Sequence, residues 1–126
     1  MPAPRVAAQA HGWPRPLRVP PMAQLGVYPP GSGVRYAPHL DRQPGETHNR
    51  RELTFLVYVS DGWDASHGGC LRLRDEHGAP TDVAPLAGRV VVFQSGRQVH
   101  EVLPCSRRDR LALTLWVEYP PDGEPV

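Results

Sequence analysis

Two histidines and an aspartate are the residues of this sequence whose types and spacing could bind a metal. His39 and Asp41 are two positions apart in the segment RYAPHLDRQ, and His100 lies far along the chain in RQVHEV. In a β-strand, residues two apart point to the same face, so the first pair is expected to present an imidazole and a carboxylate together. An HxD pair alone often arises by chance, and a lone histidine is more often a hydrogen-bonded side chain than a ligand. The three residues together predict a metal site.

The ligand set leaves two kinds of metal centre open. Two imidazoles and one carboxylate can occupy one face of an octahedral metal and leave three positions vacant, which suits Fe(II) with a bidentate 2-oxo acid and O₂. Zinc could use the same three ligands with a water molecule in the fourth position.

An arginine in the last apolar segment helps to distinguish these alternatives. Arg110 begins the run RLALTLWVEY, ten residues after His100, and shares a strand face with Thr114. A guanidinium on a cavity wall needs a planar anionic partner, and the carboxylate of a co-substrate offers a bidentate match. Tyr58 could donate its hydroxyl to the same carboxylate, although a surface arginine and a core tyrosine are the alternatives. The arginine favours iron, because a zinc hydrolase needs no such residue.

The elements that must position these residues are predicted to be β-strands. From Leu25 onward, β-rich runs alternate with turn sequences, as in LGVY, RELTFLVYVS, CLRLR, GRVVVFQSG, RQVHEVLP and RLALTLWVEY. Such spacing indicates an all-β sandwich or barrel. Eight of the sixteen prolines fall in the first thirty residues, where they disfavour helix and central strand. We therefore expect residues 1–22 to be disordered, residues 23–120 to form one domain, and residues 121–126 to be a tail.

Composition limits the class of protein. The 126 residues carry a net charge of +1 with both signs interspersed, which argues against nucleic acid or a membrane surface as the main partner. Cys70 and Cys105 are the only cysteines and form no CxxC pair, so a reducing compartment is expected. The start of the chain lacks the apolar core of a secretory signal. A cytoplasmic location is the default expectation, with the nucleus as the alternative.

The chain resembles the Fe(II)- and 2-oxoglutarate-dependent dioxygenases of the prolyl 4-hydroxylase type. The resemblance runs from about Val27 to Tyr119 and rests on YPPGSGVRYAPHLD, LVYVSDGWDASHGGCLRLR, HEVLP and RLALTLW. Within this family, the chain looks most like the catalytic core of the hydroxylases that act on hypoxia-inducible factor. The resemblance implies a double-stranded β-helix (jelly roll) with iron at one open end. The helical part typical of the family is missing before the first motif, so we expect little or no helical cover.

The resemblance also implies a role for particular residues. By motif, the iron ligands are His39, Asp41 and His100, and Arg110 binds the distal carboxylate of 2-oxoglutarate. Arg110 matches better than Arg108 because only Arg110 leads directly into LALTLW. The remaining implied contacts are to the co-substrate, from Tyr58, Thr114, Tyr28 and Leu71, and near the substrate entrance, from Arg51, Tyr36 and Trp116.

The activity that this resemblance implies is hydroxylation of a prolyl residue in a protein substrate, with release of succinate and CO₂. Its cofactor and co-substrates are Fe(II), 2-oxoglutarate and O₂, and ascorbate is an auxiliary. One alternative is an oxygenase that acts on another side chain or on a small molecule. The other is a truncated homologue that binds metal without turnover.

Two of the predicted strands carry apolar side chains on the face that points away from the proposed cavity. These residues are Leu53, Phe55, Val57, Val59, Leu111, Leu113, Leu115 and Val117. Burying one such side chain is worth roughly 1.5–3 kcal/mol, so leaving all of them in water would cost a small domain heavily. Relatives cover this face with helices that precede the first motif. We therefore expect self-association through this face.

Overall fold

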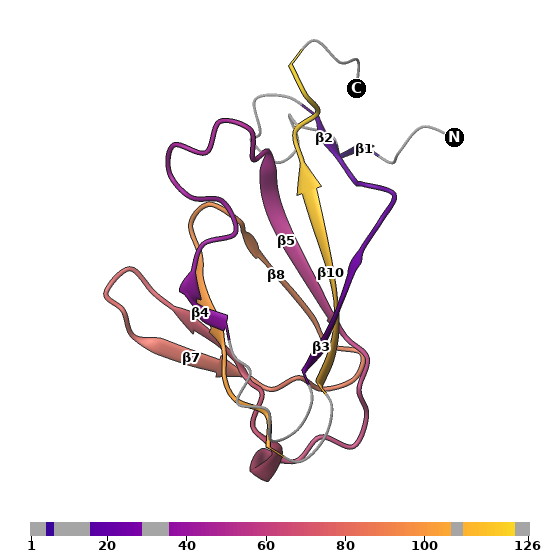
Figure 1. Cartoon of the computed structure of the whole chain (residues 1–126), viewed down its shortest axis with the longest axis vertical. Helices are drawn as coiled ribbons and strands as arrows, with labels where there is room; N and C mark the ends of the chain where they lie inside the picture. The colour runs from indigo at the N-terminus through magenta and orange to yellow at the C-terminus, as the bar shows by residue number, and fades with distance from the viewer. Residues whose placement is uncertain (1–4, 7–15, 29–35, 107–109, 123–126) are drawn as a thin grey trace.

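Two antiparallel sheets face each other and contain nearly all of the regular secondary structure of the described residues (Figure 1). The computed structural model describes residues 5–6, 16–28, 36–106 and 110–122. The larger sheet has the strand order β1-β2-β10-β5-β8, with β3 also paired to β10. Its strands are β1 (Arg5–Val6), β2 (Leu17–Arg18), β3 (Gln24–Tyr28), β5 (Arg51–Tyr58), β8 (Val90–Gln94) and β10 (Arg110–Glu118).

The smaller sheet has the order β4-β9-β6-β7 and lies to the left of the larger one in Figure 1. Its strands are β4 (Tyr36–His39), β6 (Leu71–Arg74), β7 (Pro80–Val83) and β9 (Val99–Val102). Among the described residues the single helical element is a 3₁₀ turn, η1 (Ala65–His67), and no helix there has the length and apolar character needed to span a membrane. The all-β prediction is confirmed.

Alternation along β5 and β10 turns one side of each strand toward the space between the sheets. In this antiparallel pair, Tyr58 lies opposite Ala112, and Thr54 lies opposite Trp116. On the other side of β10, Gly26 of β3 is also opposite Ala112. Directly paired residues point to the same face, so two of the smallest residues sit side by side on the inner surface. They leave room between the sheets for a cavity.

A small apolar core joins the two sheets. Phe93 of the larger sheet clusters with Leu71 and Val102 of the smaller one, and Leu71 is fully buried. Each such side chain contributes roughly 1.5–3 kcal/mol by leaving water. The smaller sheet is thereby fixed against the larger one.

The strand end that carries Asp41 differs from the sequence-based prediction. β4 ends at His39, and Asp41 lies in a bend beyond it. The reason is tertiary, because the backbone N–H of Arg42 donates to the carbonyl of Ser95 (3.1 Å) at the end of β8 instead of continuing the β4 ladder. His39 and Asp41 therefore meet through a bend, whereas strand alternation was the expected cause.

Two further segments also depart from expectation. Residues 80–83, for which the sequence predicted no strand, form the edge strand β7, with Pro80 at the first position, where a strand tolerates proline. Residues 1–22 were expected to be disordered, yet Leu17 is completely buried and Arg18 pairs with Glu118 of β10. The prolines do not prevent this pairing, because Pro16 and Pro20 lie outside β2 and an extended backbone is compatible with proline.

The outer face of the larger sheet is apolar, as predicted, and extends over four strands. Leu25, Leu113, Val57 and Val90 form one continuous cross-strand row through β3, β10, β5 and β8. Leu25 is 57% exposed and Val90 is 54% exposed. Val117 was expected to lie on the uncovered outer face, but it is buried at the end of β10, where β2 joins the sheet.

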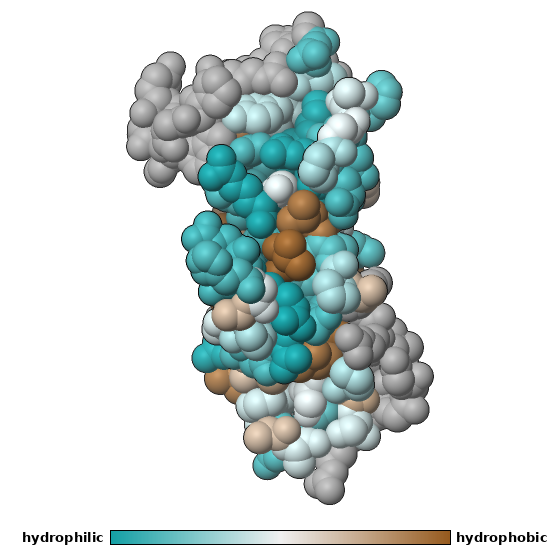
Figure 2. All heavy atoms as spheres, turned by 90° about the vertical axis from the view of Figure 1, so that its left-hand side faces the viewer, coloured by the Kyte–Doolittle hydropathy of each residue, from teal (hydrophilic) through white to brown (hydrophobic). Residues whose placement is uncertain are grey.

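The outer face of the smaller sheet has the opposite character. Arg72 makes a bidentate contact with Asp82 (2.8 and 2.9 Å), and Arg74 approaches Glu101 (3.5 Å). Figure 2 shows the side of the molecule where β4 and β7 lie, and that surface is mostly hydrophilic around a small apolar centre. The two outer faces of the molecule are thus chemically distinct.

Candidate active site

Two paired strands bring the histidines together. His39 of β4 lies directly opposite His100 of β9, and the ring centroids are 4.3 Å apart. The Nε2 atom of each ring is 3.3 Å from Oδ1 of Asp41. The potential ligand atoms of the three residues all lie within 4.8 Å of one another. The convergence predicted from the sequence is therefore present in the structure.

The hydrogen bonds of the two rings leave the Nε2 nitrogen of each histidine to face Asp41. Nδ1 of His39 is 2.7 Å from the carbonyl of Ala37, and Nδ1 of His100 is 2.9 Å from the carbonyl of Gln98. A carbonyl can only accept, so each Nδ1 carries the hydrogen. Nε2 of each ring then faces the carboxylate: a protonated ring donates from Nε2 to Oδ1, and a neutral ring presents there a lone pair that can bind a metal. Metal-binding histidines commonly donate their second N–H to a carbonyl in this way, so the donor set fits a divalent metal.

The second oxygen of Asp41 is held from the larger sheet. Oδ2 accepts from the hydroxyl of Thr54 (2.7 Å) and from Nε1 of Trp116 (3.2 Å). Burial alone would raise the pKa of Asp41, but the hydrogen bonds of His100, Thr54 and Trp116 outweigh burial and hold the pKa well below its usual range. Asp41 is therefore a carboxylate, the form that binds metal.

The bend that carries Asp41 is fixed on both sides. Asn49 donates to the backbone carbonyl of Asp41 (2.9 Å). Next along the chain, the guanidinium of Arg42 donates to Glu52 (2.6 Å) at the beginning of β5. These contacts make up for the absence of a strand ladder at this position.

Arg110 is a buried cation at the start of β10. It is 3% exposed, its Nε donates to the carbonyl of Gly69, and Nη2 donates to the hydroxyl of Tyr58 (3.2 Å). Burial raises the pKa of Tyr58, against the opposing effect of Arg110, so this phenol stays neutral. Because a guanidinium has five N–H donors in a planar fork, it can keep both contacts and still bind a carboxylate.

The predicted site residues are gathered around one cavity of about 520 Å³ between the sheets, a volume within the usual range for small-molecule sites. Among its lining residues are His39, Asp41, Arg51, Leu71, His100, Arg110, Thr114 and Trp116. Tyr58 is buried and contacts Arg110. The side chains of Tyr28 and Tyr36 lie outside the described part, although their backbones pair with Arg110 and Val102.

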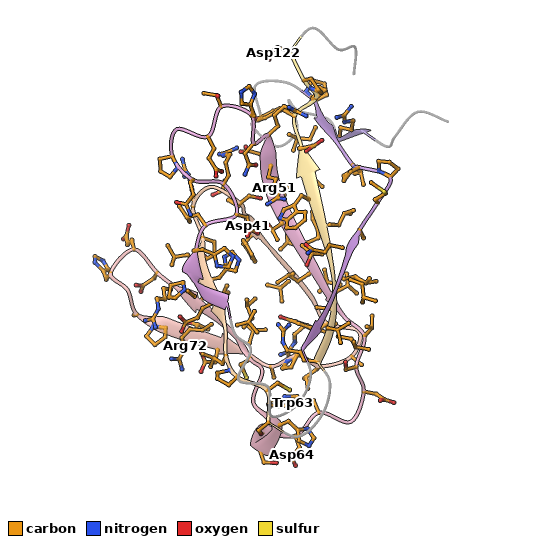
Figure 3. All side chains as sticks on the ribbon, in the orientation of Figure 1. Asp41, Arg51, Trp63, Asp64, Arg72 and Asp122 are labelled. Atoms are coloured by element: carbon orange, nitrogen blue, oxygen red, sulfur yellow. The ribbon has the colours of Figure 1, made fainter. Side chains whose placement is uncertain are left out.

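A cation stacked on an indole marks one part of the cavity wall. The guanidinium carbon of Arg51 lies 3.7 Å from the centroid of a Trp116 ring. The same guanidinium donates to the backbone carbonyl of Asp41 (3.4 Å), and Figure 3 shows Asp41 and Arg51 close together at one end of the two sheets. Trp63 and Asp64 lie at the opposite end (Figure 3). Arg51 and Trp116 are thus joined directly to the candidate metal centre.

Sequence reasoning assigned no role to several residues that support Asp41, among them Thr54, Arg42 and Ser95. Thr54 has a usable signal, because it shares the inner face of β5 with Tyr58. Arg42 and Ser95 carry no local signal, since both act through contacts between segments that are distant in the chain.

Comparison with known proteins gives a consistent result. The family model described as the 2OG-Fe(II) oxygenase superfamily matches residues 23–118. A hypoxia-inducible factor prolyl hydroxylase of Caenorhabditis elegans is 41% identical over 97 residues, which are 75% of this chain and 13% of that protein. A crystal structure of a Pseudomonas putida prolyl-4-hydroxylase superposes with a TM-score of 0.70 at 41% identity, over 78% of this chain and 52% of that one.

A third comparison concerns a complex. A Trichoplax adhaerens prolyl hydroxylase, solved with a peptide fragment of the hypoxia-inducible factor oxygen degradation domain, superposes with a TM-score of 0.68 at 29% identity. The match covers 81% of this chain and 46% of that chain. The sequence thus spans about half or less of each of these three relatives.

Proposed function

The chain belongs to the 2OG-Fe(II) oxygenase superfamily, and we propose that it is the core of a dioxygenase that hydroxylates prolyl residues in a protein substrate. Its co-substrates would be 2-oxoglutarate and O₂, and its co-products succinate and CO₂. The observation that carries the proposal is that His39, Asp41, His100 and Arg110 line one cavity. A ligand set with open positions and a buried anion-binding arginine are the two parts that this chemistry needs.

In this proposal the three converging residues hold Fe(II). His39 and His100 bind through Nε2, because each Nδ1 is engaged by a carbonyl. Asp41 binds through Oδ1, the oxygen that faces both rings. When bound, iron supplies the redox chemistry that couples decarboxylation of 2-oxoglutarate to hydroxylation of a C–H bond. The residues contribute the geometry that places metal and co-substrate in one cavity.

Arg110 would bind the distal carboxylate of 2-oxoglutarate. Its side chain is held in place by Tyr58 and by the carbonyl of Gly69, so little conformational freedom is lost when the co-substrate arrives. Thr114 and Leu71 line the same cavity, one as a hydrogen-bonding group and the other as an apolar wall. We include Tyr28 as an assisting residue, because its backbone pairs with Arg110.

The prolyl substrate is proposed from the relatives. The proteins of Caenorhabditis elegans and Pseudomonas putida are prolyl hydroxylases by name, and the Trichoplax adhaerens enzyme is paired with a peptide. In this chain, Arg51 and Trp116 form a stacked pair on the cavity wall, and we propose that they, with Tyr36, contact the peptide. Ascorbate is proposed as the reductant that maintains iron in its active state.

A peptide screen tests the substrate class. Iron-loaded protein is incubated with 2-oxoglutarate, O₂ and proline-containing peptides, and mass spectrometry locates any added oxygen. One added oxygen on a prolyl residue supports the proposal. Oxygen on another side chain, or turnover only with small molecules, would mean that the proposed substrate class is wrong, while the proposed metal and co-substrate site would stand. Metal binding without turnover under any condition means that this chain binds iron but is not an active hydroxylase by itself.

We also propose that two copies of this chain associate through the outer face of the larger sheet. The row formed by Leu25, Leu113, Val57 and Val90 is apolar from β3 to β8. Val27 and Val92 extend it at 48% exposure each. Contiguous apolar surface of this kind is characteristic of interfaces. The outer face of the smaller sheet carries charged pairs, so the larger sheet is the face that gains from being covered.

A further inference from the structure

A pair of buried hydroxyl groups lies behind the candidate metal ligand. Thr54 of β5 is 1% exposed, Ser95 at the end of β8 is completely buried, and their hydroxyl oxygens are 2.9 Å apart. Both come from the larger sheet, whereas the two histidines come from the smaller one. Buried polar groups need hydrogen-bond partners, and the partner at the end of this pair is Asp41.

The direction of these hydrogen bonds follows from the chemistry of the groups. Asp41 is ionised and can only accept, so Thr54 must give its single hydroxyl hydrogen to Oδ2. Thr54 then has none left for its neighbour, and Ser95 must be the donor to Thr54. The result is a hydroxyl chain in which Ser95 donates to Thr54 and Thr54 donates to Asp41. Each link polarises the next in a buried environment, which strengthens the final bond.

The hydroxyl chain decides which oxygen of Asp41 is presented to a metal. Oδ2 is occupied by Thr54 at 2.7 Å and by Trp116 at 3.2 Å, while Oδ1 faces both histidines at 3.3 Å. We infer that Thr54 and Ser95 are positioning residues that make Asp41 a one-oxygen ligand. A carboxylate bound through both oxygens would take an additional coordination position, and the co-substrates need the open ones. This inference rests on the proposed function.

Ser95 acts on the same ligand a second time through its backbone. Its carbonyl accepts from the N–H of Arg42 (3.1 Å), and its own N–H donates to the carbonyl of Glu52 (3.0 Å). The residue at the start of the hydroxyl chain therefore also fixes the bend that carries Asp41. Ser95 thus helps to position both the carboxylate of Asp41, through Thr54, and the backbone of the bend that carries it.

The test measures metal binding directly, with Co²⁺ as the probe. The full chain and four variants are titrated by calorimetry without oxygen, and the d–d absorption bands of bound Co²⁺ report the ligand geometry. Thr54→Val removes the hydroxyl with little change in shape, and Thr54→Ser retains it. Ser95→Ala removes only the second link of the chain. The matched control is Thr81→Val, an exposed threonine on β7.

Removing a group that hydrogen-bonds to a metal ligand typically costs about 10- to 100-fold in metal affinity. We expect a loss of this size for Thr54→Val, together with altered d–d bands of bound Co²⁺. Thr54→Ser should restore the parent's affinity and spectrum, Ser95→Ala should show a smaller loss, and Thr81→Val should match the parent. Thermal unfolding verifies that each variant is folded. If Thr54→Val does not fold, Ser95→Ala decides, because Thr54 and its methyl packing are then intact.

Two outcomes count against the account, and they can be told apart. This inference alone is overturned if the parent protein binds Co²⁺ and folded Thr54→Val or Ser95→Ala binds Co²⁺ equally tightly with the same spectrum. A parent protein that does not bind Co²⁺ at all overturns the proposed iron site, and this inference with it.

Discussion

His39 and His100 lie directly opposite each other in the antiparallel β4–β9 pair, with their ring centroids 4.3 Å apart. Each ring is anchored through Nδ1 to the carbonyl two residues earlier in the chain, Ala37 within β4 and Gln98 directly before β9. Both imidazoles are therefore oriented by backbone within a strand or next to one. The metal-binding geometry is in place before a metal arrives, so little ordering is required on binding.

Arg110→Ala should raise the KM for 2-oxoglutarate by at least about tenfold, because a hydrogen bond between charged groups is worth about 1.5–3 kcal/mol. Iron binding should remain close to that of the parent, since the hydrogen bonds of the Arg110 guanidinium go to Gly69 and Tyr58, which are not proposed ligands. Steady-state kinetics and a metal titration separate the two effects. Arg72→Ala, on the outer face of the smaller sheet, is the control. Unchanged dependence on 2-oxoglutarate would make Arg108 the candidate instead.

Gly68→Ala should destabilise the protein more than Gly78→Ala, although both glycines have a positive φ (71° and 84°). A Cβ at position 68 would lie 2.4 Å from the carbonyl oxygen of Pro104, whereas a Cβ at position 78 would meet nothing within 4 Å. A positive φ alone costs an alanine roughly 1–3 kcal/mol. At position 68 the clash with Pro104 adds to this cost. Urea unfolding measures both variants. Equal losses would mean that the loop at Pro104 moves aside easily.

The metal-free protein should lose the stabilising contribution of Asp41 in acid. The folded-state pKa of Asp41 lies below the ordinary value of 3.8, so the contribution is fully present above that value. It declines as the pH falls through the folded-state pKa. The difference in Tm between the parent and Asp41→Asn should therefore stay constant from pH 6 to about 4 and shrink as the pH is lowered further. A difference that already shrinks well above pH 4 would show that the carboxylate is not held in its ionised form.

Leu113→Lys should prevent self-association. Leu113 lies between Leu25 and Val57 in the apolar row on the outer face of the larger sheet, and a charge there could not be buried without a partner. Sedimentation velocity should show the parent as a dimer or larger species and the variant as a monomer. Thr81→Lys on the smaller sheet is the control. A parent protein that sediments as a monomer at all concentrations contradicts the proposed interface.

The residues that do the chemistry could be predicted from the sequence because their types are restrictive. Few side chains bind a divalent metal, and His39, Asp41 and His100 stand in recognisable contexts. The inner faces of β5 and β10 were also predictable, since strand alternation requires only that the strands exist. Tyr58 and Thr114 consequently lie on the face where they were expected.

The supporting structure could not be predicted in the same way. β4 ends at His39, and Asp41 reaches the histidines through a bend that depends on a hydrogen bond between Arg42 and Ser95. No local pattern indicates a contact between segments so far apart. Leu17 shows the same limitation, because its proline-rich surroundings predicted disorder and the pairing of β2 with β10 decided otherwise.

The most direct test of the central claim measures succinate formed from 2-oxoglutarate. Protein loaded with Fe(II) without oxygen is mixed with 2-oxoglutarate and a proline-containing peptide, and air is then admitted. The account predicts that the parent and Arg72→Ala form succinate in step with hydroxylation of the peptide, and that His100→Ala forms none. Succinate formation by His100→Ala at the rate of the parent would contradict the assignment of His39, Asp41 and His100 as the metal centre.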